Sequence, residues 1–209
     1  MAGGERLQTQ SGEGIRFAAP PLRAFDPELH VGVLPDGRLA VADSFAYEVK
    51  VGEPGTDPET VYRRGLLPRE TTRRDREGEK ARQLEELTAS GGPTIVMRTS
   101  DGASNRMTSE QARAMLEGRI ESMEFAEQIP VIAGMAVDWE GRIWIERTAR
   151  DVVGAGPVDV LDPGEGYLGT IEPGELAIPD AFGPAGLVAY VETDEMDVPR
   201  VVVRRAAFH

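Results

Sequence analysis

The sequence predicts a mainly β protein: an array of small antiparallel sheets, with an α-helical insertion after the first of them. Two observations support this prediction. A unit of strand, glycine-containing turn and further strands occurs twice and in part a third time, and the chain between the first two copies loses its strand pattern. A repeat of this size indicates stacked sheets rather than one continuous core, because each unit is too small to bury its apolar face alone.

Three segments contain the repeat. They are GVLPDGRLAVADSFAYEVKVGEPG at residues 32–55, GMAVDWEGRIWIERT at 134–148 continuing as PVDVLDPGEGYLGTI at 157–171, and GPAGLVAYVETDEMDVPRVVVRR at 183–205. Apolar alternation on both sides of a turn glycine is typical of antiparallel hairpins. The turn glycines of the second and third copies, Gly141 and Gly186, are 45 residues apart, and a four-stranded propeller blade repeats every ~40–50 residues. The spacing therefore predicts propeller-type blades.

The helical insertion is expected over residues 65–128. The first turn glycine, Gly37, precedes Gly141 by 104 residues, which exceeds one blade period and leaves 59 residues to be placed. Within them, Thr72 is typical of a helix N-cap and opens a charged helical run to Leu87.

A second helix is predicted from Thr108 to about Phe125. Thr108 and Gln111 have the spacing of a capping box. Apolar residues at helical spacing predict a face in contact with the sheets, with a methionine-lined ligand groove as the alternative; they are Ala112, Met115, Leu116, Ile120 and Met123.

The chain is therefore divided into five parts: an extended N-terminal segment (1–29), a first blade (30–64), the helical insertion (65–128), a second blade (129–175) and an incomplete third blade (176–209). The third unit has too few residues for a fourth strand. Ile15 and Phe17 mark the N-terminal segment as a candidate for that missing outer strand, which would close a ring.

Composition restricts the classes of function. The net charge of −13 disfavours nucleic acid as a partner, because a surface this negative repels phosphate. No apolar run is long enough to predict membrane insertion. With no cysteine and only two histidines, cysteine-type zinc sites and thiolate nucleophiles are excluded, and we expect no cofactor. The composition is that of a soluble chain, secreted or periplasmic if a leader has been removed, and leaves the compartment open.

The patterns LPDGRLAVADS-x-AYEVKV and AVDWEGRIWIE…VDVLDP-x-x-x-YLGTI resemble the NHL-type repeats of bacterial six-bladed β-propellers of the TolB-like class. The resemblance covers about two thirds of the chain and implies a partial six-bladed propeller, since three units are visible. Two copies of the chain could complete the ring as a homodimer, or the chain could be part of a longer one. The family includes scaffolds, ligand binders, lactonases and lyases, so the resemblance does not determine a function.

The resemblance also implies a position for the ligand. Aligning the copies pairs Trp144 with Tyr190 and Glu146 with Glu192, at the strand ends that face the blade-to-blade connection. The insertion would then cover an acidic face. The candidate ligand-binding residues are Trp144, Glu146, Arg147, Tyr190, Glu192 and Asp194. The alternative is structural: aromatic packing between blades and ion-paired charges at the rim.

Metal binding is a narrower hypothesis at the same face. Glu192, Asp194 and Asp197 lie close together in the run ETDEMD, and carboxylates are ligands for Ca²⁺, although the run lacks the glycine and the final glutamate of an EF-hand loop. We therefore expect a non-catalytic binding or scaffold protein, with a protein, peptide or small molecule as its ligand. The alternative function is a metal-dependent hydrolase or lyase of the propeller lactonase type.

Overall fold

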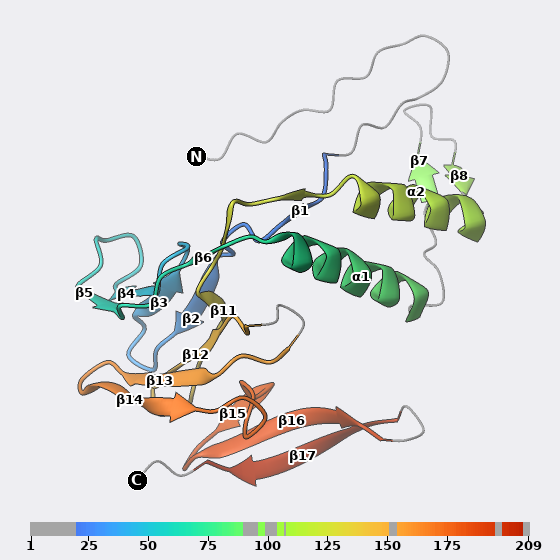
Figure 1. Cartoon of the computed structure of the whole chain (residues 1–209). Coiled ribbons are helices and arrows are strands. Elements are labelled where there is room, and N and C mark those ends of the chain that lie inside the picture. The colour runs from blue at the N-terminus through green and yellow to red at the C-terminus, as the bar shows by residue number, and fades with distance from the viewer. Residues whose placement is uncertain are drawn as a thin grey trace.

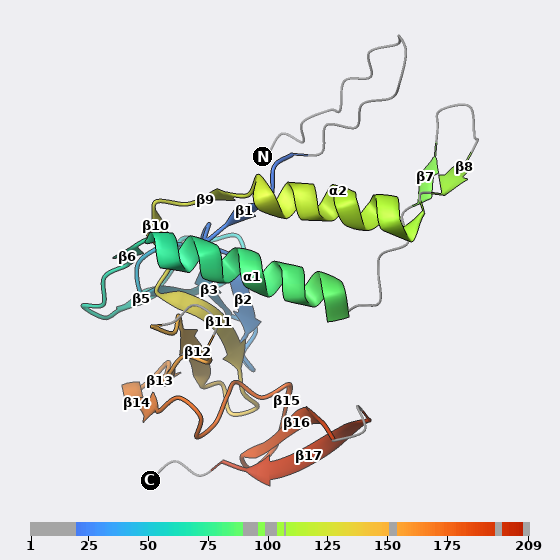
Figure 2. The same ribbon diagram turned by 45° about the vertical axis from the view of Figure 1, so that its right-hand side comes forward.

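The computed structural model describes residues 20–89, 96–98, 104–106, 108–150, 154–194 and 198–206. In these residues the protein is mainly β, with several antiparallel sheets and two helices, and none of the described sheets closes on itself (Figure 1). Three sheets follow one another along the chain and stack face to face, while the helices lie to one side of the stack (Figure 2).

Each of the three sheets is an antiparallel meander in chain order. The first sheet contains β2 (His30–Val33), β3 (Leu39–Ala42), β4 (Glu48–Gly52) and β5 (Thr60–Arg63). The second contains β11 (Ile132–Val137), β12 (Ile143–Arg147), β13 (Val158–Asp162) and β14 (Gly166–Ile171). In the described residues the third has three strands, β15 (Ala181–Gly183), β16 (Leu187–Thr193) and β17 (Pro199–Arg205). The predicted N-terminal outer strand, with Ile15 and Phe17, lies outside the described residues.

The turn glycines of the repeat have the backbone that a tight hairpin requires. Gly37, Gly141 and Gly186 have φ values of 89°, 90° and 72°. Residues that carry a Cβ rarely adopt this backbone conformation. In the first two turns an aspartate accepts backbone hydrogen bonds: Asp36 from Arg38, and Asp138 from Glu140 and Arg142. The predicted turns are therefore confirmed.

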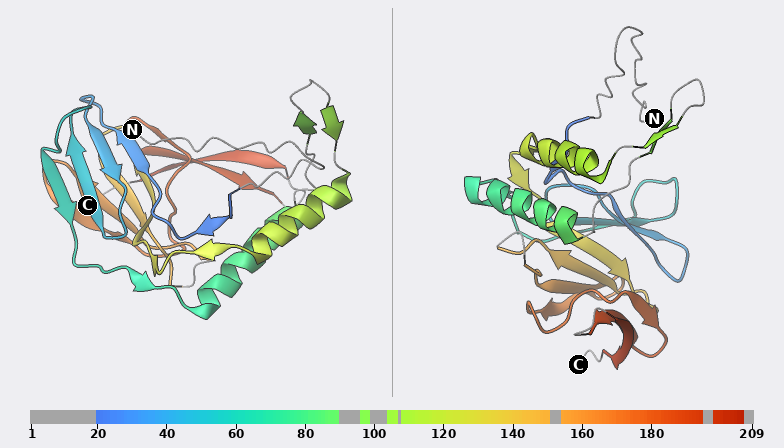
Figure 3. Two further views of the ribbon diagram at one scale, coloured as in Figure 1. Left: turned by 90° about the horizontal axis from the view of Figure 1, so that it is seen from above. Right: turned by 90° about the vertical axis from the view of Figure 1, so that its right-hand side faces the viewer.

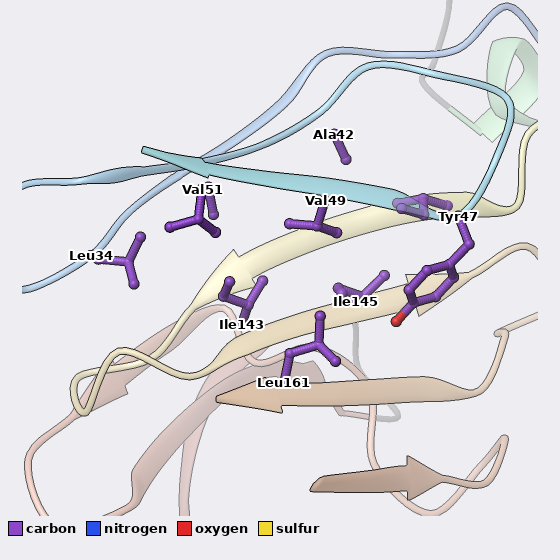
Figure 4. Packing of buried hydrophobic residues seen from close by; sticks show 10 residues of the cluster. Leu34, Ala42, Tyr47, Val49, Val51, Ile143, Ile145 and Leu161 are labelled. Atoms are coloured by element: carbon purple, nitrogen blue, oxygen red, sulfur yellow. The ribbon is translucent and has the colours of Figure 1, made fainter. Parts of the chain in front are cut away.

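The stacked sheets share two apolar cores. We call the side of a sheet that faces the preceding sheet along the chain its back face, and the opposite side its front face. For the first sheet, the front face is the side that faces the second sheet. The front face of the first sheet packs on the back face of the second, as in Figure 4, where Ala42, Val49 and Val51 point toward Ile143 and Ile145. The front face of the second sheet presents Trp144, Val158 and Val160 to the third sheet, whose Phe182 ring lies 5.5 Å from that of Trp144.

The register corrects the alignment of the third copy. Residues three positions after each turn glycine are equivalent, so Ala189, rather than Tyr190, corresponds to Ala40 and Trp144. Because neighbouring residues of a strand point to opposite faces, this shift of one residue moves Tyr190 and Glu192 to the back face of the third sheet.

Both predicted helices are present. α1 (Arg73–Ala89) follows Thr72, whose hydroxyl accepts a hydrogen bond from the backbone N–H of Asp75. α2 (Ser109–Glu121) begins after Thr108, and the capping box with Gln111 is formed. Ala112, Ile120 and Met123 of the predicted apolar face are buried, whereas Met115 is exposed.

Short strand pairings attach the helices to the sheets. β1 (Arg23–Ala24) runs parallel to β9 (Glu124–Phe125), and β6 (Arg69–Glu70) pairs antiparallel with β10 (Gln128–Ile129). A further hairpin, β7 (Val96–Arg98) with β8 (Ser104–Arg106), lies between the helices in sequence. The view from above shows the helices extending away from the sheets, with only their base close to the stack (Figure 3). Among the described residues, no helix is long and apolar enough to cross a membrane.

Candidate ligand site at the base of the helical insertion

Two cavities adjoin where the chain returns from α2 to the second sheet. Their volumes are about 530 and 270 Å³, and Ile129, Pro130 and Thr148 line both. Ile132 and Ala133, the first residues of β11, line the larger cavity, and Val131 lines the smaller one. The insertion therefore lines these cavities through its base rather than its full length.

The larger cavity lies between α1, the N-terminal segment and the beginnings of β2 and β11. Glu79 of α1 is buried at its edge and accepts hydrogen bonds from Arg82 and Gln83 at 2.7 to 2.9 Å. Burial raises the pKa of Glu79, but these hydrogen bonds outweigh it and lower the pKa below its ordinary value. Phe25 lines the cavity with φ at 66°, and its ring lies 5.6 Å from that of Phe125. The larger cavity is thus mixed in charge.

The smaller cavity is cationic and apolar. Arginines 69, 147 and 150 line it together with Thr148, and no acidic side chain is among the described residues that line it. The remaining lining is apolar: Leu66, Leu67, Ile129, Pro130, Val131 and Pro157. Leu67 is 85% exposed at this cavity.

Two of these arginines form ion pairs with buried carboxylates. Both terminal nitrogens of Arg69 donate to Asp75 at 2.7 Å, and one of them also donates to the backbone carbonyl of Arg150. Hydrogen bonds from Arg69 hold the pKa of Asp75 well below its usual range, against the opposing effect of burial. The Nε of Arg147 lies 3.3 Å from a carboxylate oxygen of Asp159, which makes an ion pair but no hydrogen bond.

Asp159 is the centre of a polar cluster between the first two sheets. Its carboxylate is fully buried and accepts hydrogen bonds from Arg64 and Thr170, both at 2.5 Å. The guanidinium of Arg64 also lies over the rings of Tyr167 and Tyr47, at 4.3 and 5.7 Å from their centroids. Burial, followed by the charge of Asp159, raises the pKa of Tyr47. Arg64 thereby joins the end of the first sheet to the second, and Asp159 also forms the ion pair with Arg147.

The structure distributes the predicted site residues over different environments. Trp144 is buried between the second and third sheets, where its indole N–H donates to Asp138 at 3.1 Å. Glu146 lies on the same strand face and accepts a hydrogen bond from the backbone of Gly156. Arg147 is the predicted residue that lines the smaller cavity.

The predicted residues of the third sheet pair within or beside that sheet. Tyr190 donates to the carbonyl of Ala177, and Arg204 lies over its ring. Glu192 forms ion pairs with Arg200 and Arg204, and Asp194 accepts from the backbone of Val198. Asp197 lies outside the described residues. Within the described part of the chain, no three histidine or acidic side chains form a group that could hold a metal ion.

Four residues at or beside the cavity were not predicted from the sequence: Arg64, Arg69, Arg150 and Asp159. Arg64 and Arg69 flank the start of the insertion, whereas Arg150 follows β12 and lies 81 positions after Arg69, so no motif links them. Asp159 gave one signal: it is an acidic residue inside the apolar run VDVLD, where a buried charge requires a partner. Comparison with protein-family models and with curated proteins gives no match for this chain.

Proposed function

We propose that the protein is a non-catalytic binding protein whose ligand combines an acidic group with an apolar body. The observation that supports this is the smaller cavity, where three arginines and six apolar residues line one hollow of about 270 Å³. A guanidinium binds carboxylate or phosphate oxygens through two parallel hydrogen bonds, and the apolar wall favours a hydrocarbon group beside them. The ligand is a small molecule or the acidic end of a peptide.

The ion pair between Arg147 and Asp159 favours binding. Asp159 forms ion pairs with both Arg64 and Arg147. One negative charge therefore faces two positive charges, and the group of three side chains keeps a net positive charge. A group that is already fixed loses little conformational entropy when the ligand binds. Although the whole chain is acidic, charges farther away than a Debye length of about 8 Å are screened at physiological ionic strength.

We further propose that the three sheets are consecutive blades of a six-bladed propeller. Support comes from the equivalence of the turns, the chain order of strands in each sheet, and the front-to-back packing of one sheet on the next. In this arrangement the cavities lie at the end of the blades from which the insertion emerges.

Binding of hexanoate, compared with hexanamide, tests the function. The acid should raise the midpoint of thermal unfolding with increasing concentration, since a ligand that binds only the folded state stabilises it, and the neutral amide should not. Arg150→Gln should weaken hexanoate binding at least about tenfold, because a hydrogen bond to a charged group is worth about 1.5–3 kcal/mol. Arg113→Gln on the exposed side of α2 is the matched control and should bind as the parent does. Equal responses to the acid and the amide, or equal binding by the Arg150 variant, would contradict the proposal.

A further inference from the structure

The two ends of the sheet stack expose apolar faces. The back face of the first sheet presents Val31 and Val33, and Val33 is 64% exposed. The front face of the third sheet presents Val191, Val201 and Val203, and Val203 is 61% exposed. Groups of exposed apolar residues on a sheet face mark interaction surfaces.

The repeat shows what each exposed face is built to contact. Val33, Val137 and Phe182 are equivalent, since each lies four residues before a turn glycine. Val137 packs against the first sheet, and Phe182 packs against Trp144 of the second. In both units the residue at this position therefore contacts the preceding sheet. Val33 occupies the same position with no preceding sheet among the described residues.

The same comparison applies at the other end of the stack. Ala40 and Trp144, three residues after their turn glycines, are buried against the next sheet. Their equivalent on the third sheet is Ala189, whose cross-strand neighbour is Val203. The third sheet therefore has an apolar front face of the kind that a following sheet covers in the first two units.

The charged groups on the back face of the first sheet are paired with one another. Lys50 lies 2.7 Å from Asp43, and Arg63 lies 2.6 Å from Glu48. Paired charges at the edge of an apolar surface reduce the cost of bringing a second surface against it, because no isolated charge loses its water.

We propose that the front face of the third sheet in one copy packs against the back face of the first sheet in a second copy. A two-fold axis makes this contact twice, and six sheets then surround one axis. In both contacts within the chain, a front face packs on a back face. A second copy therefore offers each of the two faces that are exposed among the described residues the kind of surface that covers its equivalent. This inference rests on the proposed propeller arrangement, but it does not depend on the ligand.

The mass in solution is the first test. Light scattering after size exclusion should give twice the chain mass of 22.6 kDa. Val33→Asp and Val203→Asp should each reduce the mass to that of one chain, with unchanged circular dichroism, because both side chains are exposed within the monomer. Leu67→Asp is the matched control, since Leu67 is exposed but lies at the smaller cavity, away from both faces. A single-chain mass for the parent, or a mass that increases without limit, would overturn the proposal.

Engineered disulfides test which faces meet. A Cβ on Gly32 would lie 3.4 Å from the Cβ of Val137, close to the spacing of about 3.5–4.5 Å in a disulfide. The equivalent positions across the proposed contact are Ala181 of one copy and Val33 of the other. The chain has no cysteine of its own, so a mixture of Ala181→Cys and Val33→Cys variants should form a covalent heterodimer on mild oxidation.

Each cysteine variant oxidised alone is the control and should remain uncrosslinked. A dimer that crosslinks Val33→Cys to itself would mean that identical faces meet, which excludes the six-sheet ring. A dimer that forms no crosslink in the mixture would equally contradict it. Neither result bears on hexanoate binding, so the failure of this inference and that of the proposed function are distinguishable.

Discussion

The two contacts in the sheet stack use the same repeat but different chemistry. Between the first and second sheets, a broad aliphatic core is combined with the buried Asp159 and its arginines. Between the second and third sheets, a smaller core centres on Trp144 and Phe182. The difference indicates that the first two sheets form the firm part of the stack, whereas the third is attached through fewer buried groups and should open first.

The largest expected effect tests the first of these contacts. Asp159→Asn should lower the free energy of unfolding by about 3–5 kcal/mol, because it leaves Arg64 and Arg147 beside a neutral amide in a buried site. Urea unfolding followed by circular dichroism measures the change. Asp57→Asn, at an exposed loop position, is the control. A loss as small as that of the control would mean that the aliphatic core alone holds the first two sheets together.

An intermediate effect is expected at the second contact. Trp144→Phe should lower the free energy of unfolding by about 2 kcal/mol. The smaller side chain buries less aromatic surface and lacks the N–H that donates to the buried Asp138. Amide hydrogen exchange should increase in β16 and leave β3 and β4 unchanged. Trp139→Phe changes the other tryptophan, which is exposed, and should affect neither quantity. Faster exchange in the first sheet as well would show that the three sheets open as one unit.

The smallest effect is expected at an ion pair outside both contacts. Arg69→Gln should lower the free energy of unfolding by about 1.5 kcal/mol at neutral pH, because the two hydrogen bonds from Arg69 to Asp75 are lost. Because the pKa of Asp75 is lowered in the folded protein, its contribution is present above the unfolded-state pKa of about 4 and is lost as the pH falls below that value. The difference between variant and parent should therefore shrink between pH 5 and pH 2. A difference that stays constant over this range would assign the effect to packing of the Arg69 side chain.

Local structure was largely predictable from the sequence. Gly37, Gly141 and Gly186 were identified as turn residues because few other residues adopt their backbone conformation, and Thr108 with Gln111 formed the expected capping box. These features depend on residues within a few positions of one another. The register of the third sheet was harder to predict, because a shift of one residue, from Ala189 to Tyr190, changes which face a side chain occupies.

The candidate site was much less predictable. The acidic run that begins at Glu192 stands out in the sequence, whereas the cavity is lined by arginines from two distant segments of the chain. Arg69 comes from the start of the insertion, and Arg147 and Arg150 come from the end of β12 and the residues after it. No periodicity links them, so only their position in space brings them together. Arg147 was identified for its place at a strand end, although an acidic surrounding was expected.

The sequence by itself determined the repeated hairpins, their turns and the two capped helices, because each of these depends on short-range hydrogen bonds and backbone preferences. The tertiary structure alone decided that Asp159 lies between two arginines, and that the insertion contributes its base rather than its whole length to the cavities. It also decided which apolar faces remain open at the ends of the stack. Such features depend on which surfaces meet once the sheets pack, and packing joins residues that are about a hundred positions apart in the chain, such as Arg64 and Asp159.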